Sequence, residues 1–339
     1  MNETLATKGP LSERRDRRRV VIADAPWLHA PATERLVGAG VEVAVLGQDE
    51  DLADHWRGAH VVVTNAVRLS ERELRALPNT RLIIRSGVGS EAVDVEAATR
   101  AGIWVANVPD YCADEVADHT IVLLMASMRR FGELLSGWRA RGQWNIRAQL
   151  SGVRRVRGLQ LGLVGFGRIG SRVAERAIAC GWRVAASDPQ ASPTVMRAAG
   201  IEPMVLDDLL ATSDAVSLHC PLTPATRHLI GEDALSRTKR GVVIINTSRG
   251  GLVDLDALDA AIVSGHVAAA GLDVLDGEPE PDLTHPILAR RAVLVTPHVA
   301  WYSIEARQEL GDTIAAEVFR LFDGVRPHNL INPEAQIRS

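Results

Sequence analysis

The amino-acid sequence predicts an α/β fold with two domains, each built on a parallel sheet that has helices on both faces. Along most of the chain, short apolar runs of strand length alternate with segments of helical spacing. Such alternation is typical of parallel sheets, because their strands are buried on both faces. The length of 339 residues also exceeds what one hydrophobic core usually holds, about 250–300 residues, so we expect two domains.

The strands expected in the first domain lie at 18–25, 41–47, 60–66, 81–87 and 103–109. Helical segments separate them at 31–40, 70–77 and 94–102. The alternation breaks at 113–150, where one long helical region is predicted. It then restarts and gives about six more strands before a closing helix at 303–324, which we expect to pack on the first domain.

Composition excludes several classes of protein. The chain is 46% hydrophobic and 24% charged, as in soluble globular proteins, and its net charge of −4 does not favour nucleic-acid binding. The basic run RRDRRR (14–19) could touch nucleic acid, but we expect a mobile, solvated tail there. No run is long and apolar enough for a membrane span or a secretory signal. Three scattered cysteines predict no metal site and suit the cytoplasm.

A glycine motif follows the strand predicted near residue 160. LGLVGFGRIG places Gly165, Gly167 and Gly170 in a GxGxxG between a strand and a helix. The glycines permit a tight turn, close approach of a pyrophosphate and close packing of the helix on the strand. Asp188 ends the next strand, where an acid binds the ribose of NAD and disfavours NADP. We therefore predict an NAD site whose loop comprises Gly165, Phe166, Gly167, Arg168, Ile169 and Gly170.

Three later strands each end in polar residues. Arg249 follows one strand, Asp273 and Glu278 follow the next, and His298 follows the third. Because ligands bind at the carboxyl ends of parallel strands, we expect these side chains to converge. An arginine can hold a substrate carboxylate, and a histidine can donate a proton to a carbonyl oxygen. A glutamate beside the histidine would favour its charged form.

These motifs resemble those of the D-isomer-specific 2-hydroxyacid dehydrogenase family. The resemblance rests on GFGRIG, NTSRGGLVD, GLDVLDGEP and TPHVAW, in family order and spacing, and covers about residues 60–330. It implies an NAD-dependent enzyme that interconverts a 2-keto acid and a D-2-hydroxy acid by hydride transfer. By the family pattern Arg249 binds substrate, Glu278 pairs with the histidine, and His298 is the acid/base.

The resemblance also implies further contacts of the ligands. Those with the cofactor are Thr120, Cys220, Thr226, Thr247, Arg249, Asp273 and His298. The ending PHVAWYS, with VRRVRG (153–158), is most similar to the branch containing the C-terminal-binding-protein corepressors. In that branch the tryptophan matching Trp301 lines the substrate pocket. The arginine matching Arg85 helps bind the substrate carboxylate, with backbone amides at Val88 and Gly89.

The family fold implies a discontinuous arrangement of two Rossmann-like or flavodoxin-like domains with a cleft between them. After the tail at 1–17, residues 18–111 and 303–335 would form the substrate-binding domain. Residues 112–302 would form the NAD-binding Rossmann domain. The helical region at 113–150 would make a homodimer.

Two other functions stay open at this point. One is an NAD-sensing scaffold or corepressor, which would keep the same site residues; the short flanking segments favour the enzyme. The other is a related dehydrogenase acting on phosphoglycerate, phosphite or formate; we expect no room for a regulatory domain at the C-terminus, which counts against the usual serine-pathway enzyme. The side chain of the substrate is not specified by the sequence.

Overall fold

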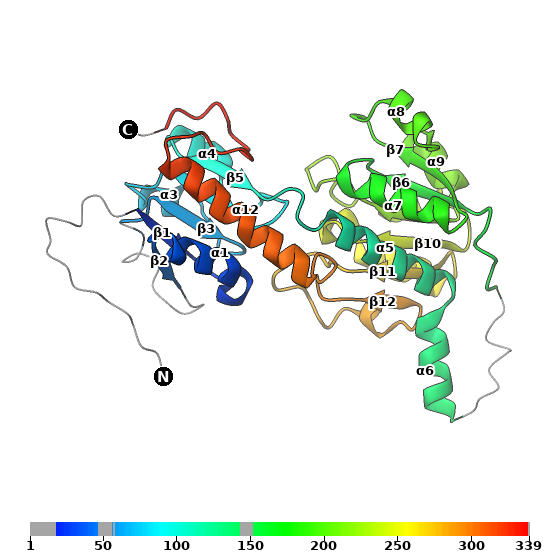
Figure 1. Ribbon diagram of the computed structural model, residues 1–339. Coiled ribbons are helices and arrows are strands. Elements are labelled where there is room, and N and C mark those ends of the chain that lie inside the picture. Colours follow the sequence, from blue (N-terminus) through cyan, green and yellow to red (C-terminus); the bar gives the residue numbers. More distant parts are fainter. Residues whose placement is uncertain (1–17, 47–55, 57, 143–151, 338–339) are drawn as a thin grey trace, which may run out of the picture. The chain divides into compact units, whose positions relative to one another are not determined.

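The protein is described here by a computed structural model that covers residues 18–46, 56, 58–142 and 152–337. The expected basic tail at 1–17 and the last part of the expected helical region, 143–150, lie outside the described residues. The chain divides into two compact units (Figure 1). The first comprises Met1–Tyr111 and Ser303–Ser339, and the second comprises Cys112–Tyr302.

The first unit contains a five-stranded parallel sheet in the order β2-β1-β3-β4-β5. Its strands are β1 (Arg19–Ile22), β2 (Glu42–Val45), β3 (Val61–Thr64), β4 (Leu82–Arg85) and β5 (Trp104–Asn107). The three central strands are almost entirely buried, as expected for a sheet that is covered on both faces. This strand order is the flavodoxin-like one, so the predicted fold class is confirmed for this unit.

Four helices of the first unit have local signals in the sequence. They are α1 (Pro26–Gly38), α3 (Glu71–Arg75), α4 (Val95–Arg100) and α12 (Ile304–Phe322). Proline begins α1, where its missing N–H has no intrahelical acceptor to lose. Ser70, Asp94 and Ser303 cap the other three by accepting backbone N–H groups of their first turns.

The closing helix α12 packs against α1 (Figure 1). Gly311 permits the close approach, because a Cβ atom there would lie 2.6 Å from the Cβ atom of Pro31. Further along the helix, the buried carboxylate of Glu317 accepts the N–H groups of His328 at 2.7 Å and Asn329 at 3.1 Å. The last segment of the chain is therefore joined to the first unit by packing and by hydrogen bonds.

The second unit contains a seven-stranded parallel sheet in the order β12-β11-β10-β9-β6-β7-β8. Its strands are β6 (Gln160–Val164), β7 (Arg183–Ser187), β8 (Glu202–Pro203), β9 (Ala215–Leu218), β10 (Val242–Asn246), β11 (Val267–Leu272) and β12 (Val293–Val295). The order reverses between β6 and β9, as in a Rossmann fold, which confirms the predicted class. The edge strand β8 is the one that the sequence analysis missed.

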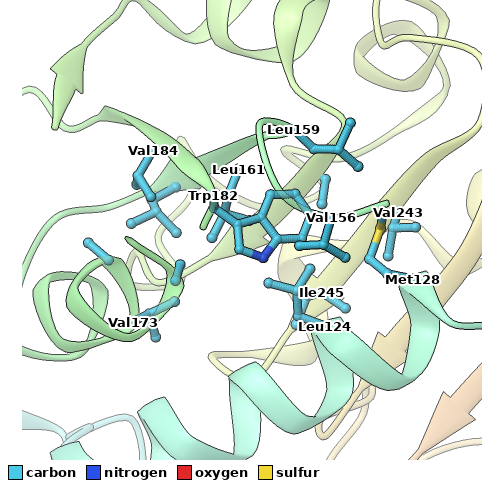
Figure 2. Packing of buried hydrophobic residues seen from close by; sticks show 14 of the residues in the cluster. Leu124, Met128, Val156, Leu159, Leu161, Val173, Trp182, Val184, Val243 and Ile245 are labelled. Atoms are coloured by element: carbon cyan, nitrogen blue, oxygen red, sulfur yellow. The ribbon is translucent and has the colours of Figure 1, made fainter. Parts of the chain in front are cut away.

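Helices cover both faces of this sheet. They are α5 (Ala113–Met128), α6 (Phe131–Arg141), α7 (Arg168–Ala179), α8 (Pro193–Ala198), α9 (Leu206–Thr212), α10 (Glu232–Ser236) and α11 (Leu255–Val263), with short 3₁₀ turns η3 (Gly250–Leu252) and η4 (Pro286–Ala289). On one face, Trp182 packs among Leu124 of α5, Val173 of α7 and the strand residues Leu161 and Ile245 (Figure 2). Across the described residues, no helix combines the length and apolarity needed to cross a membrane.

The long helical region predicted at 113–150 is broken in the structure. Helix α5 ends at Met128 and α6 begins at Phe131. Arg130 between them has φ of 54°, in the left-handed region that ends helices. Glycine normally fills this position, so the break could not be predicted from the sequence. Gly132 then lies against the backbone of Arg291, since a Cβ atom there would be 2.4 Å from its carbonyl oxygen.

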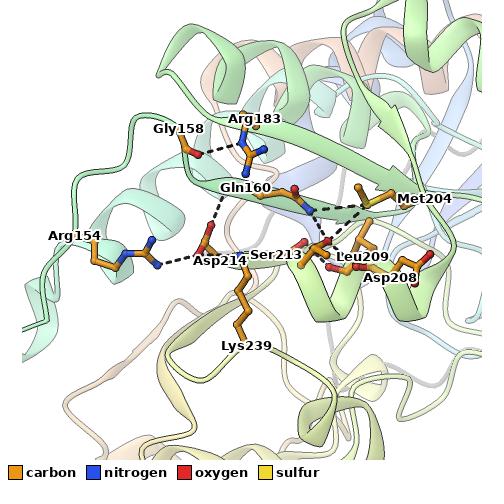
Figure 3. A network of polar contacts seen from close by, with 11 residues as sticks. Arg154, Gly158, Gln160, Arg183, Met204, Asp208, Leu209, Ser213, Asp214 and Lys239 are labelled. Carbon is orange, nitrogen blue, oxygen red and sulfur yellow. Dashed lines mark hydrogen bonds and ion pairs between the residues drawn. The ribbon is translucent and has the colours of Figure 1, made fainter.

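A buried carboxylate joins the amino ends of three strands of the second unit. Asp214, just before β9, accepts the N–H of Gln160 at 2.9 Å and Nη1 of Arg154 at 2.9 Å (Figure 3). Nζ of Lys239, just before β10, lies 3.3 Å away. Burial alone would raise the pKa of Asp214, but these hydrogen bonds and charges outweigh it and lower the pKa below its ordinary value.

We expect Asp214→Asn to lower the free energy of unfolding by about 2 kcal/mol at pH 7, the scale of hydrogen bonds to a charged acceptor. Because the folded pKa is lowered, the contribution of the charge is present above the unfolded pKa of about 3.9. It is lost as the pH falls through the folded value. Urea titrations should therefore show a smaller difference in the free energy of unfolding between wild type and Asp214→Asn at pH 3.5 than at pH 7. Asp208→Asn, on an exposed side chain of α9, is the control, and an equal effect there would contradict the prediction.

Candidate functional site

The glycine loop connects β6 to α7 through backbone contacts that exclude larger side chains. Gly165 has φ of 99°, and a Cβ atom there would lie 2.7 Å from the backbone carbon of His219. A Cβ atom on Gly170 would lie 2.4 Å from the carbonyl oxygen of Gly165. These two glycines therefore serve the close packing of β6, α7 and the segment after β9.

Gly167 differs from its neighbours, because it faces open space. It is the N-cap of α7, and no atom lies within 4 Å of the position where its Cβ would be. The helix that follows directs its free N–H groups and the positive end of its dipole toward this space. Such an arrangement fits a pyrophosphate, so the loop Phe166–Ile169 has the shape and charge that the NAD prediction requires.

Asp188 follows β7 and lies beside this loop. Its Oδ2 accepts the N–H of Phe166 at 2.8 Å, while Oδ1 accepts those of Gln190 at 2.8 Å and Ala191 at 3.2 Å. The carboxylate is thus placed by backbone hydrogen bonds at the edge of the glycine loop. Its expected contact with a ribose stays a prediction.

The segment after β9 lies on the other side of the glycine loop. His219 is partly buried, its Nε2 lies 2.9 Å from Oγ of Ser217, and burial lowers its pKa to about 4. Burial also raises the pKa of the Cys220 thiol, with a further contribution from the charge of Asp188. The hydroxyl of Thr226 donates to Pro221 within its own turn at 2.7 Å. The predicted cofactor contacts Cys220 and Thr226 thus follow the strand that adjoins β6.

The turn after β10 presents Arg249. Asn246 stabilises the turn, since its Nδ2 donates to the carbonyl of Arg249 at 2.8 Å and its Oδ1 accepts the N–H of Ser248 at 3.0 Å. The hydroxyls of Thr247 and Thr120 lie 2.7 Å apart, and Thr120 is fully buried. Helix α5 therefore contacts this turn through one of the residues that we expected at the cofactor.

A second buried carboxylate shapes the turn after β12. Asp273 is 1% exposed, and its Oδ1 accepts the Thr296 hydroxyl at 2.5 Å and the N–H of Val299 at 3.0 Å. Its Oδ2 accepts the N–H of Ala300 at 3.0 Å, and its carbonyl accepts that of His298 at 2.7 Å. We predicted Asp273 as a cofactor contact; in the structure its carboxylate holds the segment that carries His298.

His298 and Glu278 form a direct pair. Nδ1 of His298 lies 2.5 Å from Oε2 of Glu278, and Oε1 of Glu278 accepts the N–H of Leu275 at 2.9 Å. Burial alone would raise the pKa of Glu278. The hydrogen bond and charge of His298, the bond from Leu275 and the charge of Arg249 outweigh burial, so the pKa of Glu278 lies below its ordinary value. His298 and Glu278, predicted from separate strands, are therefore brought together, and the charge of Arg249 acts on the same carboxylate.

Trp301 is fixed close to the histidine. Its Nε1 donates to the carbonyl of His298 at 3.0 Å, and its ring meets that of Tyr302 edge-on with centroids 5.4 Å apart. His298 itself has φ of 52°, a conformation that is uncommon outside glycine. The backbone of this turn is therefore held in an unusual shape by the contacts of Asp273 and Trp301.

The other predicted substrate residues belong to the first unit, at the carboxyl end of its sheet. Arg85 ends β4, and its Nη1 lies 1.8 Å from where a Cβ of Gly87 would be, so the guanidinium occupies the space of that missing side chain. Asn107 donates to the carbonyl of Val88 at 2.6 Å. Among the described residues, the N–H groups of Val88 and Gly89 meet no protein acceptor, as an anion nest would require.

Two polar residues that support these sites, Asp24 and His119, were not predicted from the sequence. Asp24 accepts the N–H groups of Asn65, Ala66 and Val67, and thereby fixes the loop after β3. His119 of α5 contacts Thr296 in the second unit. Each lies in or beside a strand end or helix without a motif of its own. Asp24 offered one signal, a polar residue in the otherwise apolar segment 20–25, whereas His119, between Asp118 and Thr120, offered none.

Comparisons with known proteins agree with this geometry. Residues 121–300 match the NAD binding domain of the D-isomer specific 2-hydroxyacid dehydrogenases. D-3-phosphoglycerate dehydrogenase of Mycobacterium tuberculosis is 41% identical over 302 residues, which are 88% of this chain and 56% of that protein. The chain thus spans about half the length of the phosphoglycerate dehydrogenases that it matches.

Two further proteins extend the comparison. Hydroxypyruvate reductase of Thermotoga maritima is 37% identical over 261 residues, 77% of this chain and 83% of that protein. The crystal structure of D-lactate dehydrogenase from Aquifex aeolicus, complexed with NAD and lactic acid, aligns with a TM-score of 0.81 at 27% identity. That alignment covers 90% of this chain and 96% of that chain. The chain belongs to the D-isomer specific 2-hydroxyacid dehydrogenase family, and its second unit carries the NAD-binding domain.

Proposed function

We propose that the protein interconverts a 2-keto acid and a D-2-hydroxy acid with NAD(H). The observation that carries this proposal is the pair formed by His298 and Glu278, on whose carboxylate the charge of Arg249 also acts. An acid/base, its charged partner and a guanidinium are the groups that reduction of a keto acid requires. They follow neighbouring strands on the sheet that also presents the glycine loop.

The cofactor would bind at the loop Gly165–Gly170, with its pyrophosphate facing Gly167 and the N-terminus of α7. Asp188 would accept hydrogen bonds from the ribose hydroxyls of NAD and repel the 2′-phosphate of NADP. Thr120, Cys220, Thr226, Thr247 and Asp273 are proposed as further contacts. When bound, the nicotinamide supplies or accepts the hydride.

His298 would supply the proton during reduction and accept it during oxidation. Because its Nδ1 is paired with Glu278, Nε2 is the nitrogen that would face the substrate oxygen. The negative charge of Glu278 favours the protonated ring, and the short hydrogen bond fixes the orientation of the ring.

Arginines would bind the substrate carboxylate. Arg249 would hold it by charge-assisted hydrogen bonds and polarise the carbonyl oxygen. Arg85 and the N–H groups of Val88 and Gly89 would contribute from the first unit, and Trp301 would line the pocket. These assignments rest on the resemblance together with the local geometry of each residue.

The relatives favour particular substrates within this class. Their names point to 3-phosphoglycerate, hydroxypyruvate and lactate. Phosphoglycerate is supported by the higher identity, 41% against 37% for the reductase. Similarity to the C-terminal-binding-protein branch stays a prediction that rests on Trp301 and its neighbours.

We also propose a homodimer that works in the cytoplasm and associates through the helical region at 113–150. Val122, Phe131 and Leu135 on α5 and α6 support it, since these large apolar side chains are 62%, 49% and 44% exposed. Light scattering should give twice the mass of one chain. A monomer at all micromolar concentrations would contradict the proposal.

Two alanine substitutions in the glycine loop should separate cofactor binding from folding. Gly167→Ala adds a methyl group to open space, so it should leave the melting temperature unchanged but weaken NADH binding by at least ~10-fold through lost approach of the phosphates. Gly170→Ala should instead lower the melting temperature, because its Cβ meets the backbone of Gly165. NADH fluorescence and thermal melts measure both effects. Unchanged NADH affinity in Gly167→Ala would show that the phosphates do not bind at this loop.

The proposed activity is tested with a panel of keto acids and NADH, followed by the loss of NADH absorbance. Pyruvate, glyoxylate, hydroxypyruvate and 3-phosphohydroxypyruvate cover the substrates that the relatives suggest. At least one should be reduced, with NADH preferred over NADPH by at least ~10-fold in kcat/KM because of Asp188. His298→Ala should lower kcat by about 10²–10⁴-fold while NADH binding survives. Full activity of that variant would exclude His298 as the proton donor.

The pair with Glu278 should be visible in the pH dependence of reduction. The lowered pKa of Glu278 means that it stays ionised at neutral pH, where its charge favours the imidazolium that reduction consumes. Glu278→Gln keeps a hydrogen-bonding group but removes the charge. The falling alkaline limb of kcat/KM should therefore move to lower pH by about one unit. Glu280→Gln, at the exposed residue two positions further along the chain, is the control and should leave the alkaline limb unchanged. An alkaline limb that is also unchanged in Glu278→Gln would show that Glu278 is not the charged partner of His298.

A further inference from the structure

Helix α5 carries a histidine that contacts Thr296, in the turn that holds His298. His119 has a side chain that is 23% exposed, and its Nε2 lies 2.9 Å from Oγ1 of Thr296 and 3.6 Å from Oδ1 of Asp273. Asp273 in turn accepts the N–H groups of Val299 and Ala300, the two residues that directly follow His298. A chain of hydrogen bonds thus runs from α5 to the segment that holds His298.

The direction of these bonds follows from the chemistry of the partners. The carboxylate of Asp273 can only accept, so the single proton of the Thr296 hydroxyl is donated to it over 2.5 Å. The oxygen of Thr296 is then left with lone pairs alone toward His119. Nε2 of His119 must therefore carry a proton and donate it, which defines the role of that nitrogen in the network.

We propose that His119 is a positioning residue for His298, acting through Thr296 and Asp273. Its Nε2–H fixes the Thr296 hydroxyl, the hydroxyl saturates Oδ1 of Asp273, and the carboxylate holds the backbone on which the catalytic ring is oriented. The inference rests on the proposed role of His298 as the proton donor. His119 itself is assigned no contact with substrate or cofactor.

The conformation of His298 explains why such support is needed. A residue other than glycine with φ of 52° is less favourable than in the right-handed region by about 1–2 kcal/mol. Without the hydrogen bond from the Thr296 hydroxyl to Asp273, the turn would be stabilised less strongly in this conformation. A shift of the ring by about 1 Å is enough to cost up to 10²-fold in rate.

His266 offers a matched control in the same unit. Its Nε2 lies 3.1 Å from Oγ1 of Thr238, so it makes the same kind of contact with a threonine. It stands directly before β11, at the amino ends of the strands, whereas Thr296 follows β12 at the carboxyl ends. If loss of any histidine–threonine contact lowers activity, substitution of His119 and of His266 should do so equally. If the effect acts through His298, only substitution of His119 should lower activity.

The experiment compares His119→Leu, His119→Gln and His266→Leu. His119→Leu removes the donor, and we expect kcat for keto-acid reduction to fall about 10–100-fold, with KM and NADH affinity within about 2-fold of wild type. His119→Gln places an amide N–H near Nε2 and should recover most of the rate. His266→Leu should leave kcat unchanged. An equal fall in His266→Leu, or no fall in His119→Leu, would overturn the proposal.

A double variant tests whether His119 acts through His298. If His119 acts only through His298, adding His119→Leu to His298→Ala should lower the residual rate no further. Full multiplication of the two effects would show a separate structural role. Loss of activity in His298→Ala with unchanged rates in the His119 variants would overturn this inference and leave the proposed function intact.

A measurement that needs no turnover covers the case in which no keto acid is reduced. In protein labelled with ¹⁵N-histidine, the ring signal of His298 is identified by its loss in His298→Ala. His119→Leu and Thr296→Val should both move that signal, and His266→Leu should not. A His298 signal that stays in place in both variants would overturn the proposal whether or not the enzyme assay succeeds.

Discussion

The buried carboxylate of Asp273 is the interaction on which the candidate active site depends. Withdrawing a carboxylate from water costs several kcal/mol, and hydrogen bonds to a charged acceptor return about 1.5–3 kcal/mol each. Thr296, Val299 and Ala300 supply three such bonds. Burial of the charge is therefore favourable only while the turn after β12 keeps its shape. The direction of the His298 ring is thus fixed by the folding of the second unit, before any substrate binds.

The first unit uses the same device with different residues. Asp24, just after β1, is 6% exposed and accepts the N–H groups of Asn65, Ala66 and Val67 at 2.7, 2.5 and 3.0 Å. The loop after β3 is therefore shaped by a carboxylate that does not belong to it. In both units the carboxyl ends of parallel strands bear turns whose N–H groups have no strand partner. A buried acid satisfies several of these groups at once.

The sequence predicted the parts of the fold and site that leave a periodic or motif signal. The alternating apolar runs predicted both sheets, and GFGRIG predicted the turn at Gly165, where no other residue fits. Three features had no such signal. Arg130 ends α5 in a conformation that usually calls for glycine, β8 is two residues long, and His119 sits on a helix like any half-buried histidine. Asp273 was recognised as important, but its hydrogen bonds to Val299 and Ala300 depend on how a turn 26 residues later folds back, which spacing along the chain does not encode.

The proposed division between supporting and reacting groups agrees with the exposure of their side chains. Asp273 is 1% exposed, whereas the side chains of Glu278 and His298 are 29% and 46% exposed. A fully buried acid with permanent hydrogen bonds is suited to hold a backbone. The exposed pair can exchange protons with a ligand, and the lowered pKa of Glu278 shows that its neighbours outweigh burial in setting its charge. Rigid support and reversible proton transfer require opposite environments. The ends of the neighbouring strands β11 and β12, which Asp273 and His298 follow, provide both.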